Sequence, residues 1–310
     1  GDQGGSPGFL MADSAGVALA SNAGPDRPLT PTGAEAFRLG GKDAPPEDFH
    51  QVGSWNVGVD DEGRIHVMDH ERHQVHRFDA TGEHLASFGG TGGGPGELRI
   101  PLLLAVSPRG EIRVPDLSKG AIVRWDPEGS VLEQLPFPEG YVGGKMAWGE
   151  SGAVFHLRGA DGERLVLRPG EPDSVTLATS PRPQGRDLHF ASCGLGLSNF
   201  PRLFTPSMAW ASQGSLVAVI NTGVYQVDLF DEGRLVRSIR REVPPRPVTR
   251  EMALASLGEG MRVRTAGGEL LCDPSEVVDA QGYEPFLPIL SEVALAPDGT
   301  LWVRRYALGD

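Results

Sequence analysis

The sequence has few cysteines, no long apolar run and no excess of positive charge. Its densest apolar stretch, 102–106, is long enough only for a strand, so we expect no membrane-spanning segment. The 310 residues carry a formal net charge of −13. That charge disfavours nucleic acid as a partner, because a basic surface is needed to displace counterions from phosphates. Neither cysteine lies in a C-x-x-C motif or a Cys/His cluster, which disfavours a redox or zinc pair.

Two alternatives remain for Cys193 and Cys272. In an exported protein they would commonly form a disulfide, whereas in a cytosolic one they would stay reduced. The chain begins at Gly1 without an initiator methionine, and we interpret residues 1–12 as a flexible tether left after processing. This interpretation favours an exported protein that is periplasmic, secreted or lipid-anchored.

A seven-residue phrase occurs five times: a large apolar residue, Gly or Ala, another apolar residue, three turn residues and Gly. The copies occupy residues 57–63, 104–110, 146–152, 208–214 and 293–299. Each is typical of a short strand that enters a glycine turn, and a second strand rich in β-forming residues follows. After four of the copies a second glycine turn follows, at Gly82, Gly129, Gly170 and Gly233. This spacing predicts four-stranded antiparallel units.

We therefore predict an all-β fold, a β-propeller of four-stranded blades that forms a single domain over residues 13–310. The Gly or Ala of each phrase would keep crowded inner strands apart. The chain ends after the second strand of the last unit, so we expect the N-terminal strands 17–21 and 36–39 to complete it and close the ring. Thr249 and Gly258 flank a segment that predicts a short helical insertion near 249–258.

Blade one carries a resemblance to a known family. Residues 69–82, the following stretch 88–98 and Pro101 resemble NHL-repeat propellers, and the whole chain is similar to six-bladed propeller proteins exported by bacteria. Segments 13–17 and 244–249 also fit that group. The resemblance implies six blades, although five phrases can be counted. It implies no catalytic residues, because these proteins share no catalytic signature.

The repeat also separates two faces. Turns inside each unit are short and regular, whereas the turns between second and third strands and the links between units are long and irregular. Functional residues concentrate on such loops, so we expect a ligand there or at the channel mouth. The ligand-binding candidates are His70, Arg72, His73, Lys119, His156, Arg158, His189, Asn221 and Arg304.

A metal site is the alternative for some of these residues. His50, His70, His73, Asp69 and Asp116 could supply ligands for a divalent metal at the channel mouth, although we predict no cofactor. Asp69 and Asp116 occupy equivalent repeat positions, however, and the resemblance to NHL-type blades implies that the carboxylate at this position instead braces a turn. The glycine-rich loop 92–96 could present N–H groups to a phosphate, but it is more typical of a link between blades.

Two functions remain open at this point. The first is a non-enzymatic scaffold of the bacterial envelope or exterior that binds a protein, peptide or glycan, with a monomer favoured. The second is a metal-dependent lyase or hydrolase with its site at the channel mouth.

Overall fold

The computed structural model describes residues 9–22, 35, 37–40, 49, 52–53, 56–142, 144–159, 161–265 and 268–308. Strands predominate in this part of the chain, which contains two helices of eight residues each. The chain divides into two compact units, and each is described by itself. We call Asp26–Gly159 with Glu163–Thr179 the three-sheet unit, and Gly1–Pro25, Ala160–Gly162 and Ser180–Asp310 the disulfide unit.

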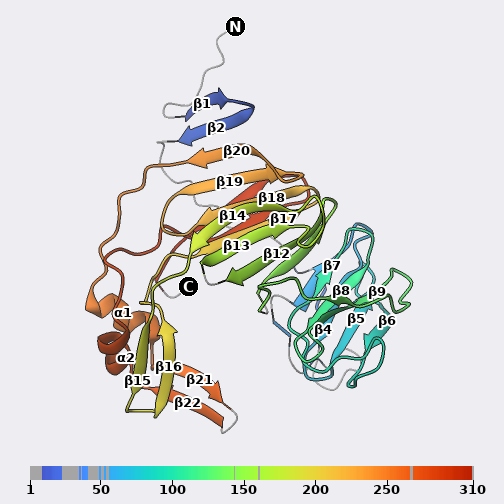
Figure 1. Cartoon of the computed structure of the whole chain (residues 1–310), viewed down its shortest axis with the longest axis horizontal. Coiled ribbons are helices and arrows are strands. Elements are labelled where there is room, and N and C mark those ends of the chain that lie inside the picture. Colours follow the sequence, from blue (N-terminus) through green and yellow to red (C-terminus); the bar gives the residue numbers. More distant parts are fainter. Residues whose placement is uncertain are drawn as a thin grey trace. The chain divides into compact units, whose positions relative to one another are not determined.

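The three-sheet unit consists of three four-stranded sheets, and in each sheet the strands are hydrogen-bonded in sequence order (Figure 1). The first sheet contains β3 (Val57–Val59), β4 (Ile65–Asp69), β5 (Gln74–Phe78) and β6 (His84–Gly89). The second contains β7 (Ala105–Val106), β8 (Ile112–Asp116), β9 (Ala121–Trp125) and β10 (Leu135–Pro136). The third contains β11 (Met146–Gly149), β12 (Gly152–Gly159), β13 (Gly162–Leu167) and β14 (Val175–Pro181). The repeat thus marks real four-stranded units.

The small residue of the phrase has the predicted role in the first sheet. A Cβ atom added to Gly58 on β3 would lie 2.6 Å from Cγ2 of Val106 on β7, so only glycine permits this approach between the two inner strands. The turn glycines are required for a different reason: Gly63 and Gly82 have φ angles of +76° and +92°, which side-chain-bearing residues rarely adopt. The phrase therefore encodes both a turn and a close strand contact.

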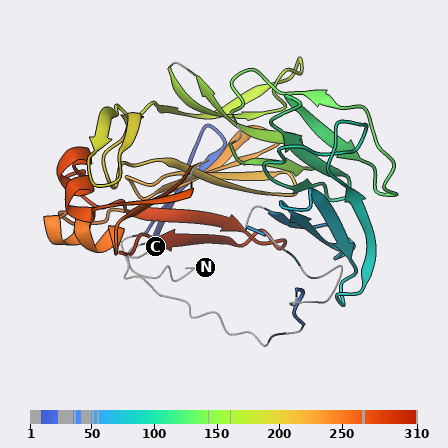
Figure 2. The ribbon, with the colours of Figure 1, turned by 90° about the horizontal axis from the view of Figure 1, so that it is seen from below.

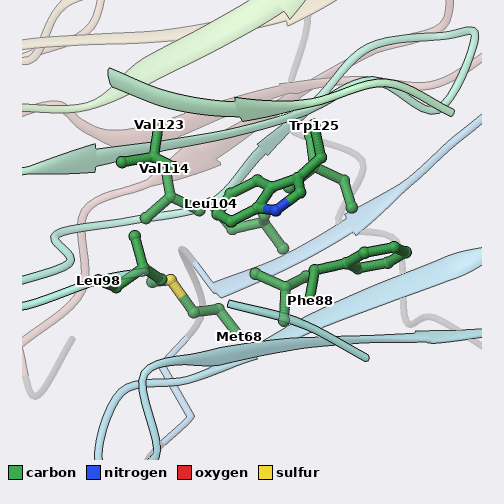
Figure 3. Packing of buried hydrophobic residues seen from close by; sticks show 9 residues of the cluster. Met68, Phe88, Leu98, Leu104, Val114, Val123 and Trp125 are labelled. Carbon is green, nitrogen blue, oxygen red and sulfur yellow. The ribbon is translucent and has the colours of Figure 1, made fainter. Parts of the chain in front are cut away.

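Apolar side chains join the three sheets. Met68, Val75 and Phe88 of the first sheet pack against Leu104, Val114, Val123 and Trp125 of the second (Figure 3). A second cluster, which includes Ile122, Met146 and Phe155, joins the second and third sheets. These contacts make the three sheets one packed body, because the second sheet buries one face against the first sheet and the other face against the third.

The disulfide unit contains a six-stranded sheet in the order β1-β2-β20-β19-β18-β17 (Figure 1). Its strands are β1 (Phe9–Ser14), β2 (Val17–Asn22), β17 (Met208–Gln213), β18 (Leu216–Asn221), β19 (Gln226–Asp231) and β20 (Arg234–Arg240). The last copy of the phrase begins the hairpin of β23 (Leu290–Leu295) and β24 (Leu301–Arg305). This hairpin packs on β17 and β18, and its Leu290 and Val293 share one apolar cluster with Ala218, Ile220 and Val227.

The N-terminal strands have a different partner from the one predicted. β2 pairs in parallel with β20, from Ala18 opposite Arg237 to Ser21 opposite Arg240, and not with β24. Residues 37–40 form no strand; Phe37 and Leu39 lie beside the glycine turn at Gly82. The physical reason is that β20 is the outer strand of its own meander, and β2 satisfies backbone groups that this edge would leave unpaired. Within the described residues, the fifth copy of the phrase forms two strands.

Two insertions form a small module at the disulfide (Figure 2). It contains the hairpin β15 (Arg186–Phe190) and β16 (Leu195–Phe200), the hairpin β21 (Met261–Thr265) and β22 (Gly268–Cys272), and helices α1 (Arg250–Leu257) and α2 (Pro274–Gln281). The prediction of α1 is confirmed, including its cap: the Thr249 side chain accepts a hydrogen bond from the Met252 N–H. Helix α2, capped by Asp273, was not predicted. Cys193 is joined to Cys272, with 4.9 Å between their Cα atoms.

Candidate functional site

The candidate site is the loop end of the three-sheet unit. We define it as the turns β4–β5, β8–β9 and β12–β13 together with the links β6–β7 and β10–β11. Backbone hydrogen bonds hold turns and links together: the Leu117 N–H donates to the Ile100 carbonyl over 2.9 Å, and the Arg158 N–H donates to the Gly140 carbonyl over 2.8 Å. Irregular segments are thereby fixed on a rigid scaffold.

Two carboxylates of this end brace turns. Asp69 is fully buried, and its Oδ1 accepts hydrogen bonds from the N–H groups of Glu71 and Arg72 over 3.0 and 3.4 Å. Asp116 is also fully buried, and it accepts from the N–H groups of Arg99, Ile100 and Lys119. The equivalent repeat positions thus have equivalent structural roles, which leaves neither carboxylate directed to a surface ligand.

His70 and His73 lie close to one another on the β4–β5 turn. The Nε2 atom of His70 lies 3.2 Å from Oδ1 of the buried Asn56, and His73 Nδ1 lies 3.3 Å from the Thr91 hydroxyl. Burial, and next the charge of His73, lower the pKa of His70. His70 therefore presents a neutral imidazole at neutral pH, which can donate or accept one hydrogen bond at each nitrogen.

Lys119 and the glycine-rich loop are mutually fixed. The Lys119 Nζ donates to the Gly94 carbonyl over 2.9 Å. Within the loop, the Gly94 N–H donates to the Glu97 carboxylate over 2.6 Å, and a Cβ at Gly92 would collide with the same carboxylate. An internal anion therefore occupies the position that a phosphate would need, and the phosphate alternative is wrong for the loop in this conformation.

His156 and Arg158 meet at one carboxylate on the third sheet. His156 Nε2 lies 3.0 Å from Glu163 Oε2, and Arg158 Nε donates to Glu163 Oε1 over 3.0 Å. Burial lowers the pKa of His156, although Glu163 opposes this shift. The Arg158 side chain is 58% exposed, whereas Glu163 is 18% exposed. The carboxylate thus orients a cationic group that remains accessible to a ligand.

The remaining candidate residues do not belong to the described loop end of the three-sheet unit. His189 is on β15, and Asn221 accepts a hydrogen bond from the Gly223 N–H in the β18–β19 turn. Arg304 is on β24, where its Nη1 lies 3.4 Å from Glu292. All three belong to the disulfide unit. His50 lies outside the described residues.

No metal-binding set forms among the residues that the structure describes, since nowhere do three His, Cys, Asp or Glu side chains come together. The predicted ligands Asp69 and Asp116 are occupied by backbone N–H groups. These residues therefore do not fit a divalent cation without rearrangement of their turns.

A buried polar layer, which was not predicted from the sequence, lies at the opposite end of the three-sheet unit. The Asp60 and His66 side chains are both fully buried and lie 3.1 Å apart, while Arg64 donates to the same carboxylate over 2.7 Å. Burial, followed by the charge of Arg77, lowers the pKa of His66 despite the Asp60 contact. Arg77 reaches across to the second sheet and donates to the Pro127 carbonyl over 2.6 Å.

A related set joins the second and third sheets. Glu111 Oε1 accepts from Arg113 and Arg124, each over 2.9 Å. The Arg113 guanidinium lies 3.1 Å from the centre of the Trp148 ring, and burial lowers the pKa of Arg113 to about 10. In the sequence, the signal for both sets is that charged residues alternate with apolar ones on the two middle strands of a sheet, β4 and β5 in the first sheet and β8 and β9 in the second. They hold sheets together and expose no site.

This arrangement defines the class of protein: an all-β chain built from four-stranded, sequentially connected sheets, the blade unit of a β-propeller. Neither helix of the described residues is long and apolar enough to cross a membrane. No protein-family model matches the sequence, and it matches no curated protein.

Solved structures with a similar arrangement include a candidate exported protein from Bacteroides fragilis, with 14% identity and a TM-score of 0.43 over 67% of this chain and 57% of the other. This chain thus spans little more than half of that protein. Virginiamycin B lyase from Staphylococcus aureus has 14% identity and a TM-score of 0.38, over 82% of this chain and 78% of the lyase. The Swd1 β-propeller domain of Myceliophteria thermophila has 13% identity and a TM-score of 0.39, over 83% and 64%. Likenesses at this level assign no activity or ligand to this chain.

Proposed function

We propose that the protein is a non-enzymatic binding scaffold, an NHL-like propeller exported from the cell, that holds a peptide or glycan at the loop end of the three-sheet unit. One observation carries the proposal: polar side chains from all three sheets of that unit, namely His73, Lys119, His156 and Arg158, are fixed by hydrogen bonds yet partly exposed. Fixed donors of this kind lower the entropy cost of binding.

The arrangement supports binding better than catalysis. At the loop end, the buried Asp69 and Asp116 are both engaged by backbone N–H groups, and His156 is engaged by Glu163. A general base needs a pKa near the working pH and access to the proton it removes. The lowered pKa and partial burial of His70 and His156 instead favour neutral imidazoles that donate or accept hydrogen bonds.

The test is a panel of immobilised glycans and a displayed random-peptide library, each screened against the full chain. We expect selected ligands whose binding falls about tenfold or more in Lys119→Met and Arg158→Gln, because each substitution removes a charge-assisted contact. Glu128→Gln, on an exposed turn at the opposite end of the same unit, is the matched control and should leave binding unchanged. Selected ligands that are lost with Glu128→Gln and retained by both loop-end variants would contradict the proposal, as would a panel without any selected ligand.

A further inference from the structure

One serine on the outer strand of the first sheet is in contact with two histidines. Ser87 lies on β6, and its Oγ atom is 2.9 Å from His76 Nδ1 on β5 and 2.9 Å from His84 Nε2 on β6. Ser87 and His76 are directly opposite one another in the strand pairing. None of the three side chains belongs to the loop end, so a reaction here is independent of the function proposed above.

The hydrogens available in this cluster assign different roles to the two imidazoles. A serine hydroxyl carries one hydrogen and two lone pairs, and a neutral imidazole accepts at one nitrogen and donates at the other. While both rings are neutral, the hydroxyl can donate to only one of them, and the other ring donates its N–H to Oγ. One imidazole is thus placed to remove the hydroxyl proton, within the range of about 2.6–3.2 Å that is typical of a nucleophile and its base.

Burial indicates which of the two rings is the base. His76 is 2% exposed, whereas His84 is partly exposed on the strand at the edge of the sheet. A base that removes a proton from a surface hydroxyl must afterwards release it to the leaving group or to water. His84 has the access that this step needs, which leaves the His76 Nδ1–H as the donor that orients the hydroxyl.

Aromatic rings hold both imidazoles in position. The fully buried Phe78 ring packs edge-on against the His84 ring, with 5.5 Å between their centroids. The centroid of the Phe49 ring lies 5.7 Å from that of His76 and 6.1 Å from that of Phe78. This packing fixes both nitrogens around Oγ before a reactant arrives, and such prior orientation is the condition under which a neighbouring group accelerates a reaction most.

The serine is open to a reactant, although the rings beside it are packed. Ser87 is exposed, and β6 is the last strand in the sheet order β3-β4-β5-β6. An acyl donor can therefore approach Oγ from solvent. A hydroxyl with a base beside it suits an electrophile that carries its own leaving group, such as an activated ester.

We propose that Ser87 is a nucleophile that accepts an acyl group from an activated ester. Oγ attacks the ester carbonyl carbon while its proton passes to His84 Nε2. The bond from Oγ to the acyl carbon forms, the bond from that carbon to the leaving oxygen breaks, and the departing alcohol or phenol takes up the proton. The product is an acylated Ser87, a covalent modification that requires no turnover and leaves a binding role of the loop end intact.

The experiment is incubation of the full chain with p-nitrophenyl acetate at neutral pH, followed by digestion and tandem mass spectrometry of the Ser87 and Ser118 peptides. Ser118, exposed on the β8–β9 turn, is the internal control for an ordinary surface hydroxyl. We expect Ser87 to be acetylated at least about tenfold faster, because a positioned base typically accelerates a reaction by about 10²–10⁴-fold. In urea the two serines should react at similar rates, since unfolding separates Ser87 from its histidines.

Two substitutions separate the roles of the two imidazoles. His84→Gln places an amide nitrogen near the position of Nε2 but cannot take up a proton, so it should slow the acetylation of Ser87 about tenfold or more. His76→Asn keeps an N–H donor near the position of Nδ1 and should retain most of the rate. His189→Gln, on β15 in the other unit, is the matched control and should leave the rate unchanged.

Equal rates at Ser87 and Ser118 in the folded chain would overturn the proposal, as would an unchanged rate in His84→Gln or an equal effect of His189→Gln. An acetyl group on His76 or His84 in place of Ser87 would also overturn it, because an imidazole would then be the nucleophile. The comparison of Ser87 with Ser118 uses the unsubstituted chain, so it tests the proposal even if a variant does not fold.

Discussion

At the scale of single residues, the charged groups of the three-sheet unit are of two kinds. His66, Asp60 and Arg113 are buried between sheets, where each is paired with a group of opposite or complementary character. Arg158 and Lys119 remain at the surface of the loop end. Burial penalises the charged form of a histidine, so the buried layer depends on pH in a way that the surface groups do not.

Acidification should destabilise the protein. The pKa values of His66, His70 and His156 are all lowered from 6.5 by burial. The unfolded chain therefore binds protons first, and stability is fully present above about pH 6.5 and decreases as the pH falls below it. We expect the urea midpoint to be lower at about pH 5.5 than at about pH 7.5.

A pair of variants tests whether His66 contributes to this pH dependence of stability. His66→Gln should reduce the difference between the two midpoints, while His189→Gln, exposed on β15, should retain it. A midpoint that rises on acidification, or that changes equally in the two variants, would contradict a role for His66.

Removal of the Glu111 carboxylate should be costly. Glu111→Gln leaves Arg113, whose side chain is 6% exposed, without its anionic partner. Loss of one member of a buried ion pair typically costs about 3–5 kcal/mol of unfolding free energy. Because Glu111 is partly exposed, we expect a cost of about 2–3 kcal/mol. Urea unfolding measures it, with Glu128→Gln as an exposed control. A loss below about 0.5 kcal/mol would show that the Trp148 ring alone stabilises Arg113.

At the scale of elements, the turns and the strand partners within each four-stranded unit were predictable, whereas the partner of the N-terminal strands was not. Gly63 and Gly82 leave a local signature, because a positive φ is needed at one position of each turn. Asp69 and Asp116 could be assigned as turn braces because they occupy equivalent repeat positions, and each accepts from an N–H group two or three residues ahead. The bonds of Asp116 to the N–H groups of Arg99 and Ile100, 17 and 16 residues back, had no local signal. β2 pairs with β20, more than 200 residues away in sequence, and no local pattern encodes such a partner.

The burial of the charged side chains between sheets could not be predicted from the sequence either. His66 and Arg77 appear in the sequence as polar residues of ordinary strands, and their buried positions depend on a neighbouring sheet. Helix α2 was missed although Asp273, Pro274 and Glu276 form a helix-start pattern and Gly282 follows its end. The ligand-binding role of the loop-end residues stays a prediction, since chemistry at a surface leaves no periodic signal.

The cap of α1 offers a test at this scale. Thr249→Ala should cost about 1 kcal/mol of unfolding free energy, because it removes the acceptor for the Met252 N–H. Thr249→Ser keeps that oxygen and should retain most of the stability. The measurement is chemical denaturation of the three proteins, and equal losses in both variants would assign the effect to the Thr methyl group instead.

Loss of the disulfide should loosen one module selectively. Cys193→Ser with Cys272→Ser removes a link across 79 residues, which is expected to cost about 2–4 kcal/mol. Hydrogen exchange should accelerate at amides of β15, β16 and α2. Amides of β8 and β9, in the other unit, are the internal control, and equal acceleration there would mean that the link stabilises the chain as a whole.

At the scale of the whole molecule, the fold supplies rigidity and the irregular segments supply chemistry. Sequentially connected sheets position the loop end, and insertions outside the repeat form the disulfide module. A single propeller domain over residues 13–310 stays a prediction, as does export.

The same charge that disfavours nucleic acid also predicts the state of association. With a net charge of −13, identical chains repel one another at low salt, so we expect a monomer. Light scattering after size exclusion should give a mass near 33.0 kDa. Twice that mass, independent of dilution, would contradict the prediction.

The disulfide encloses the whole β17–β20 meander between its two cysteines. A protease that cuts once inside this interval, for example at an accessible turn such as the one at Glu232, therefore leaves two fragments that stay covalently joined. Such a nicked chain would migrate as intact protein on a non-reducing gel and separate only after reduction. In an extracellular setting, the disulfide would thus make the protein tolerant of a single proteolytic cut. It would keep the strands on either side of the cut at high effective concentration, so that the sheet persists.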